Sequence, residues 1–114
     1  MSEPTNDPLR VLDGILAERR GQCPESSYVA SLYAKGLSAI AQKVGEEATE
    51  TVIAAMSNRR EELVKETADL WFHSLVLLAN AGLDSRDVLA ELARRQGTSG
   101  HDEKRARLAH THGE

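Results

Sequence analysis

Residues 43–50 read KVGEEATE, and residues 66–69 read ETAD. Each of these two segments contains a pair of acidic residues at i, i+3 spacing. The pairs are Glu47 with Glu50 and Glu66 with Asp69. On an α-helix this spacing places both side chains of a pair on one face, about one turn apart. Two such helices joined by a short turn can therefore bring four carboxylates into one pocket.

A pocket of four carboxylates requires a cation, because uncompensated carboxylates repel one another and raise one another's pKa. Ligation by oxygen alone favours a hard divalent ion, with Mg²⁺ preferred and Mn²⁺ as an alternative. The spacing also has a simpler explanation, since glutamates at i, i+3 are common on solvated helix surfaces. The residue pattern alone therefore leaves both a metal site and a solvated surface open.

The segments around the acidic pairs have helical periodicity. Apolar residues recur from Leu37 to Ala55 at helical spacing, which predicts a helix that ends near Met56. A further helix is predicted from about Arg60 to Ala81. Its second half is apolar almost all round, so we expect burial on more than one side. A chain of this size has limited means to bury such a helix, and we therefore expect it to pack against a second copy.

The flanking segments predict further helices. Asp7 is a favourable N-cap before Pro8, and Gly21 stops the first helical pattern. Residues 21–27 are expected to form a loop, and the next few residues up to Gly36 are ambiguous. Asp84 or Ser85 is expected to cap the last helix. The predicted fold is all-α, with four to five helices per chain packed as a homodimer.

The composition limits the class of protein. The chain has 114 residues, enough for one domain, and a net charge of −4, which argues against a general nucleic-acid surface. The longest nearly apolar run is too short to span a bilayer, and the N-terminus has no signal-peptide pattern. The single cysteine, Cys23, fits a reducing compartment, so a cytoplasmic location is expected. We expect one domain over residues 1–96 and a polar, disordered tail over residues 97–114.

The motifs carry a resemblance to a known family over roughly residues 9–95. They comprise the Ser27-Tyr28 loop, the run from Lys43 to Glu50, and Glu66-Thr67-Ala68-Asp69-Leu70-Trp71-Phe72-His73. With these motifs the chain resembles the phosphoribosyl-ATP pyrophosphohydrolases of histidine biosynthesis, within the all-α, MazG-like superfamily. The resemblance implies hydrolysis of the α–β phosphoanhydride of phosphoribosyl-ATP, which releases pyrophosphate and phosphoribosyl-AMP. It also implies Mg²⁺, a helical bundle, and a homodimer with substrate near the subunit interface.

Candidate roles follow for the charged and polar side chains. The expected metal ligands are Glu47, Glu50, Glu66 and Asp69. Glu46 or Glu47 is the candidate general base, and the sequence does not choose between them. The candidate substrate-binding residues are Lys43, Lys35, Ser27 and Tyr28. His73 lies one turn beyond Asp69 and either orients it or is an ordinary core histidine.

Other interpretations of these residues remain open. Lys43 can form an ordinary i, i+4 ion pair, and Ser27 and Tyr28 can be a helix cap and a packing residue. The carboxylate set also suits a housekeeping pyrophosphohydrolase of (d)NTPs. A non-catalytic helical dimer with solvated carboxylates is the interpretation from a different functional class.

Overall fold

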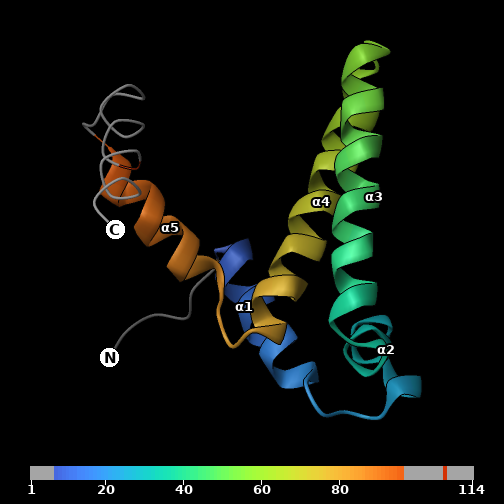
Figure 1. Ribbon diagram of the computed structural model, residues 1–114, viewed down its shortest axis with the longest axis vertical. Coiled ribbons are helices and arrows are strands. Elements are labelled where there is room, and N and C mark those ends of the chain that lie inside the picture. The colour runs from blue at the N-terminus through green and yellow to red at the C-terminus, as the bar shows by residue number, and fades with distance from the viewer. Residues whose placement is uncertain (1–6, 97–106, 108–114) are drawn as a thin grey trace.

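The computed structural model describes residues 7–96 and residue 107, and all regular structure within that part of the chain is helical. The elements in chain order are α1 (Pro8–Arg19), the 3-10 turn η1 (Pro24–Ser26), α2 (Tyr28–Lys35), α3 (Leu37–Met56), α4 (Arg60–Asn80) and α5 (Ser85–Arg95). Figure 1 shows α3 and α4 as the two long helices, with α1 and α2 near one end of α4. The all-α prediction is confirmed, and the proposed tail over residues 97–114 lies outside the described residues apart from Arg107.

Helices α1 and α2 begin and end at residues whose side chains or backbone conformations favour helix ends. The Asp7 side chain accepts a hydrogen bond from the Leu9 backbone N–H, and Pro8 occupies the first helical position. The Ser27 hydroxyl caps α2 by accepting from the Ala30 N–H at 3.0 Å. Gly36, with φ of 95°, separates α2 from α3 in a conformation that glycine adopts without steric cost. The stretch that was ambiguous from sequence is therefore a short helix ended by a glycine.

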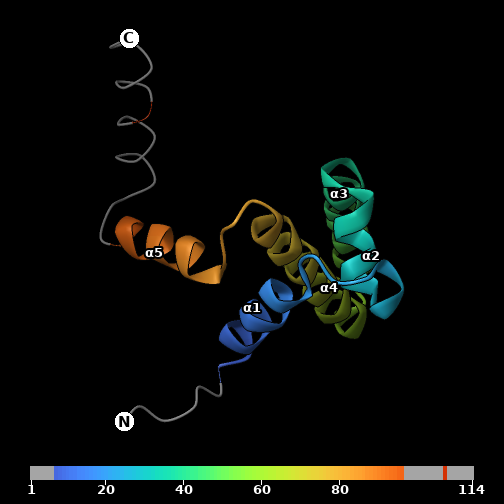
Figure 2. The ribbon, with the colours of Figure 1, turned by 90° about the horizontal axis from the view of Figure 1, so that it is seen from below.

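Helices α3 and α4 form an antiparallel hairpin. Both ends of α3 and the start of α4 agree with the prediction, and α4 ends one residue earlier than expected. The connection contains Asn58, which has a left-handed φ of 57° that asparagine tolerates better than most residues. Figures 1 and 2 both show α3 and α4 running side by side over their length. This hairpin places the middle of α3 opposite the first half of α4.

The core lies at the end of the hairpin where α1 and α2 pack. It is formed by Leu16, Val29, Leu32, Ile40, Leu75, Val76 and Ala79. The second half of α4 supplies three of these residues, which explains much of its apolar composition. Trp71, however, remains 59% exposed. Within one chain that half of α4 is therefore only partly buried, as expected for a chain of this size.

Helix α5 is attached by a buried polar contact with α1. Asp13 is 8% exposed, and its Oδ1 accepts from the Ser85 backbone N–H at 3.0 Å while its Oδ2 accepts from the Ser85 hydroxyl. Arg10 forms an ion pair with Asp13 at 3.2 Å. Asp84 and Asp87 add a capping box at the start of α5. The expected choice between two caps is thus resolved: Asp84 is the N-cap, and Ser85 is held by α1.

Replacing Asp13 by Ala should lower the free energy of unfolding by about 2–3 kcal/mol, because the buried Ser85 N–H and hydroxyl lose a charged acceptor. Urea denaturation monitored by circular dichroism measures this change. Asp87→Ala is the matched control, since it removes an exposed cap of the same helix and should cost about 1 kcal/mol. Equal losses in the two variants would show that the Asp13 contact is not a special anchor of α5.

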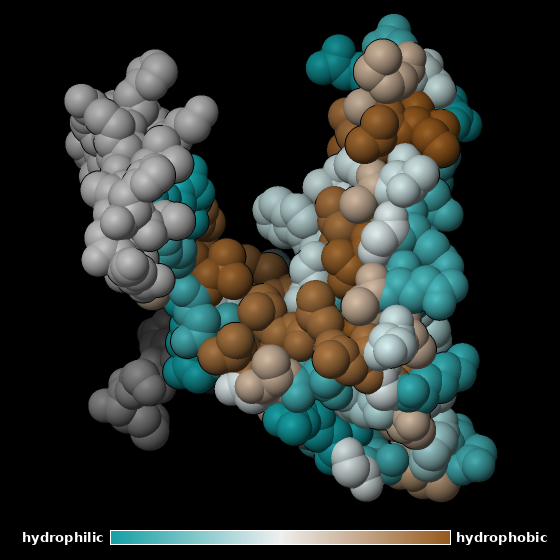
Figure 3. Space-filling model, in the orientation of Figure 1, coloured by the Kyte–Doolittle hydropathy of each residue, from teal (hydrophilic) through white to brown (hydrophobic). Residues whose placement is uncertain are grey.

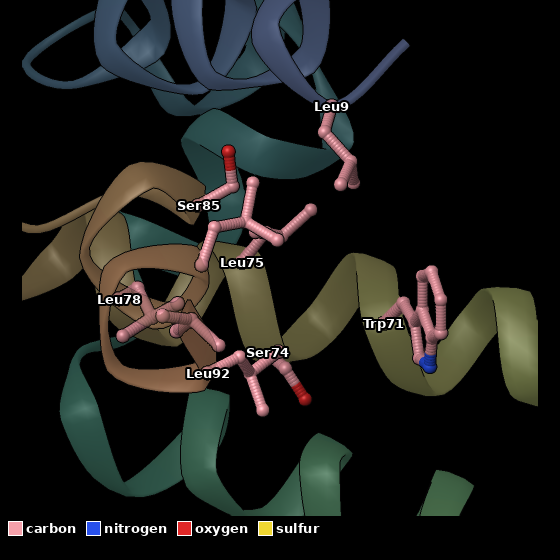
Figure 4. A pocket seen from close by; sticks show the side chains of 9 residues that line it. Leu9, Trp71, Ser74, Leu75, Leu78, Ser85 and Leu92 are labelled. Carbon is pink, nitrogen blue, oxygen red and sulfur yellow. The ribbon is translucent and has the colours of Figure 1, made fainter. Parts of the chain in front are cut away.

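An open apolar groove of about 330 Å³ lies between α4 and α5. Its lining residues are Leu9, Trp71, Ser74, Leu75, Leu78, Ser85, Val88, Leu89 and Leu92. Figure 3 shows apolar surface along this groove. Figure 4 labels Trp71 of α4 and Leu92 of α5 among the side chains that line it. The described helices include none with the length and apolar content of a membrane span. The groove lining is an exposed apolar surface, and such surfaces often mark an interaction site.

Candidate active site

Three of the predicted ligands meet between α3 and α4. One carboxylate oxygen each from Glu47, Glu66 and Asp69 lies within 4.8 Å of the other two. Glu47 comes from the middle of α3, and the other two come from the facing first half of α4. The antiparallel hairpin thus brings together residues that are far apart along the chain. Oxygen atoms at this mutual spacing can share one small cation.

The burial of the cluster favours a cation rather than solvation. Glu47 is only 7% exposed. Its Oε2, like the Oε2 of Glu66, is inaccessible and has no hydrogen-bond partner among the residues that the structure describes. A buried polar atom without a partner is costly, and a buried carboxylate is stable only when it is paired, protonated or bound to metal. The donor set therefore fits a hard divalent ion.

The electrostatics of the cluster agree with this fit. Burial is the main cause that raises the pKa of Glu47 above its usual value, and the neighbouring carboxylates of Glu50 and Asp69 raise it further. The carboxyl of Glu50 is the main cause that raises the pKa of Glu66. Glu50 is exposed and does not belong to the group of three, but it lies close enough to repel both glutamates. The cluster as a whole is therefore short of positive charge.

Lys43 and Glu46 lie at the edge of the cluster. The Lys43 ammonium is 3.4 Å from Glu46 Oε2 and 3.7 Å from Glu47 Oε1. Glu46 is exposed, and hydrogen bonds from Gln42 and then Lys43 lower its pKa. Glu46 thus holds its proton less tightly than an ordinary glutamate, whereas Glu47 holds its proton more tightly. The two candidate bases, inseparable from sequence, differ clearly in environment.

His73 lies next to the cluster and is 6% exposed. Its Nδ1 is 2.9 Å from the main-chain carbonyl of Asp69 and 3.8 Å from Glu47 Oε1. It therefore contacts Asp69 through the backbone rather than through the carboxylate, and its burial agrees with the interpretation as a core histidine. Its Nε2 is 2.8 Å from the hydroxyl of Tyr28. This contact joins α2 to α4 across 45 positions, and no sequence pattern predicted it.

The structure places the remaining predicted substrate residues, all on or next to α2, in different surroundings. Tyr28 is half exposed and is the main cause that raises the pKa of Lys43, so its hydroxyl lies near the ammonium. Ser27 has the cap role that was its alternative interpretation. Lys35 is the exposed last residue of α2, and the structure gives it no ion pair with the described carboxylates. The proposed phosphate roles of Lys35 and Lys43 remain predictions.

Comparison with known proteins gives consistent matches over most of the chain. Residues 9–96 match the family model described as phosphoribosyl-ATP pyrophosphohydrolase. The chain is 59% identical over 99 residues to a phosphoribosyl-ATP pyrophosphatase of Rhizorhabdus wittichii, covering 87% of this chain and 93% of that protein. It is 56% identical over 104 residues to the protein of the same name from Hydrogenovibrio crunogenus, covering 88% and 92% of the two chains. The matched region contains all the carboxylates of the cluster.

Proposed function

Since this chain belongs to the phosphoribosyl-ATP pyrophosphohydrolase family, we propose that it hydrolyses the α–β phosphoanhydride of phosphoribosyl-ATP with the help of Mg²⁺. The products are phosphoribosyl-AMP and pyrophosphate, in the second step of histidine biosynthesis. The observation that carries the proposal is the group formed by Glu47, Glu66 and Asp69, whose carboxylate oxygens lie within 4.8 Å of one another. Such a group is suited to an anionic triphosphate only when a cation accompanies it.

Glu47, Glu66 and Asp69 would hold the ion, and Glu50 is the nearby carboxylate that would complete the set. When bound, Mg²⁺ supplies the positive charge that the triphosphate needs and acidifies water. Mn²⁺ has similar ligand preferences and is the expected substitute. The Lys43 ammonium, which pairs with two glutamates at the edge of the cluster, would bind a phosphate oxygen. Binding and orientation, rather than covalent chemistry, then account for most of the catalysis.

Of the two candidate bases, we favour Glu47. Its Oε2 has no partner within the described residues and its pKa is raised, so it suits proton acceptance from the attacking water. Glu46 is exposed, has a lowered pKa and is already bonded to Gln42 and Lys43. The attacking water would give its proton to Glu47 as its oxygen bonds to phosphorus and pyrophosphate leaves.

The experiment that tests the function is pyrophosphate release by the purified protein with Mg²⁺ and phosphoribosyl-ATP. A panel of (d)NTPs run in parallel separates this reaction from that of a housekeeping pyrophosphohydrolase. Strong turnover of (d)NTPs with none of phosphoribosyl-ATP would overturn the proposed substrate. Absence of saturable Mg²⁺ or Mn²⁺ binding at millimolar concentration would support solvated carboxylates instead.

The contribution of the cluster to the stability of the metal-free protein should fall as the pH rises, and the stabilising effect of bound metal should increase. Because folding raises the pKa of Glu47 and Glu66 above the ordinary value of 4.5, these groups stabilise the metal-free fold at low pH. That stability is lost as the pH rises from about this value toward neutrality. Saturating Mg²⁺ should then raise the melting temperature by about 5 °C or more at neutral pH, and much less near pH 4.5.

Scanning fluorimetry with chelator or with Mg²⁺ across this pH range measures both effects. An uncharged osmolyte and a NaCl series of equal ionic strength serve as controls, since charge screening alone also reduces repulsion. A shift of equal size at every pH, or one that NaCl reproduces, would contradict a carboxylate metal site.

We also propose that the protein is a homodimer. The groove between α4 and α5 is apolar and open, and Trp71, Leu89 and Leu92 are each more than two-fifths exposed along it. A further exposed apolar group lies on the hairpin and comprises Val52, Ile53, Met56 and Val64. A second copy of the chain would cover these surfaces, as the family resemblance implies. The enzyme is expected in the cytoplasm, where the exposed thiol of Cys23 would stay reduced.

A further inference from the structure

Two open hollows on the surface of α4 meet at Trp71. One is the apolar groove between α4 and α5, and the other, of about 320 Å³, is lined by Leu63, Val64, Thr67, Ala68 and Trp71. Trp71 lines both hollows and is 59% exposed, and Val64 is 70% exposed. A largely apolar strip therefore follows α4 from Val64 to Leu78, over about four helical turns.

The side chains of this strip recur at intervals of three and four residues. The strip comprises Trp71 and, on either side of it, Val64, Thr67, Ala68, Ser74, Leu75 and Leu78. At about 100° per residue these positions fall within roughly 120° of one face of α4. This width and spacing are typical of a helix surface that packs along another helix. Glu66 and Asp69 lie about 140° and 160° from Trp71 around the helix, so the carboxylate cluster faces α3 and not the strip.

The strip is also symmetric along its length. Each of its positions before Trp71 has a counterpart the same number of residues after it, so the strip matches itself when two copies of α4 lie antiparallel. In that arrangement Val64 faces Leu78, Ala68 faces Ser74, and Trp71 lies on the two-fold axis. The small side chains of Ala68 and Ser74 flank both indole rings and leave room for them. A two-fold contact between identical chains requires such a self-complementary surface.

The charge at the end of the strip favours the antiparallel direction. Arg60 lies about 20° from Trp71 around α4, in line with the strip, and it is exposed without an ion pair to any described residue. Two parallel copies would place their Arg60 guanidinium groups side by side. In the antiparallel arrangement each Arg60 lies near the C-terminal end of the other α4, where helix carbonyls favour a cation. Asp87, exposed in the first turn of α5, adds negative charge at that end.

We propose that a second copy of the chain packs its α4 antiparallel along this strip, with Trp71 of both copies at the two-fold axis. The first turns of each α4 then cover the groove between α4 and α5 of the other copy. This inference rests on the homodimer proposed above and names the surface that joins the two chains. Because the strip lies on the side of α4 away from the carboxylate cluster, each copy keeps its cluster within its own hairpin.

Cross-linking between two proteins with one cysteine each tests this arrangement. With Cys23 replaced by Ser in both, one protein carries Ala68→Cys and the other Ser74→Cys, two changes among small residues. The two thiols should face each other across the interface, within the Cα separation of up to about 7 Å that a disulfide needs. In either protein alone the two identical cysteines are offset by about 9 Å along the helix axes and should not bond.

After subunit exchange and mild oxidation, the mixture should give a covalent dimer of twice the chain mass of 12.5 kDa, and neither protein alone should do so. Light scattering on the wild type separates this inference from the dimer on which it rests. A wild-type monomer would overturn the homodimer itself. A dimer whose mixture gives no cross-link, or whose single proteins cross-link as fast as the mixture, would overturn the antiparallel packing and leave the homodimer standing.

Tryptophan fluorescence tests the centre of the strip without any substitution, because Trp71 is the only tryptophan in the chain. Dilution of the wild-type protein until it dissociates should move the emission maximum to longer wavelength, since the indole then enters water. The shift should occur over the same concentrations as the fall in mass measured by light scattering. Dissociation with no change in emission would show that Trp71 lies outside the interface and would overturn the inference.

Discussion

Replacing Glu47 by Gln should reduce turnover of phosphoribosyl-ATP by about a hundredfold or more and should at the same time raise the melting temperature of the metal-free protein. The amide has almost the shape of the carboxylate but is a weaker metal ligand and cannot act as a base. Loss of a general base costs about 10²–10⁴ in rate. The rise in stability follows because burial and the neighbouring acids raise the pKa of Glu47, so its charge destabilises the metal-free fold.

Glu46→Gln is the matched control for this prediction. It makes the same chemical change one position along α3, at an exposed side chain that is bonded to Gln42 and Lys43. Turnover should change by less than about fivefold, and stability should not rise, since the pKa of Glu46 is lowered in the fold. Steady-state kinetics with Mg²⁺ and thermal melts in chelator measure both quantities. An active Glu47→Gln enzyme, or an inactive Glu46→Gln enzyme, would reverse the assignment of the base.

The sequence was sufficient for the parts of the fold that depend on local chemistry. The boundaries of α1 and α3, the start of α4 and the caps at Asp7 and Asp84 agree with the prediction, because each depends on neighbouring residues. The convergence of the carboxylates could also be anticipated. Periodicity fixes the face of each helix, and a short turn requires antiparallel packing. The order of the acidic residues along the chain then determines which of them meet.

Contacts between distant residues could not be anticipated from local patterns. Asp13 is buried because it binds Ser85, and the two lie 72 positions apart. The sequence left His73 either as a residue that orients Asp69 or as a core histidine, and it did not predict the contacts with the Asp69 carbonyl and with Tyr28. Each of these contacts depends on how α1 and α2 pack against the end of the hairpin. A helical pattern specifies a face for a side chain, but the partner opposite that face depends on the tertiary arrangement.

The different exposure of Glu46 and Glu47 also depends on the tertiary fold. The two residues are adjacent and chemically identical, and their charges are the same in the unfolded chain. A rotation of about 100° between successive helical positions directs Glu47 toward α4 and leaves Glu46 in solvent. Burial and neighbouring carboxylates then raise the pKa of Glu47, whereas hydrogen bonds from Gln42 and Lys43 lower that of Glu46. The raised pKa of Glu47 therefore depends on the packing of α3 against α4, and the lowered pKa of Glu46 on neighbours along α3.

Replacing Leu89 by Glu should convert the proposed dimer into a monomer. Leu89 lines the groove between α4 and α5 and is 44% exposed in the single chain. Burial of an unpaired carboxylate in an apolar interface costs several kcal/mol, so the dissociation constant should rise by at least about a hundredfold. Light scattering after gel filtration should give a mass near the chain mass of 12.5 kDa for the variant and near twice that mass for the wild type.

Ala90→Glu adds the same charge at the next position of α5, at an exposed residue that does not line the groove. This variant should remain dimeric and should melt at the wild-type temperature to within about 2 °C, as surface substitutions usually do. Leu89→Glu should melt earlier, because the apolar groove and Trp71 would then stay in contact with water. A wild-type protein that is already monomeric at micromolar concentration, or a dimer that tolerates Leu89→Glu, would show that a second copy does not cover this groove.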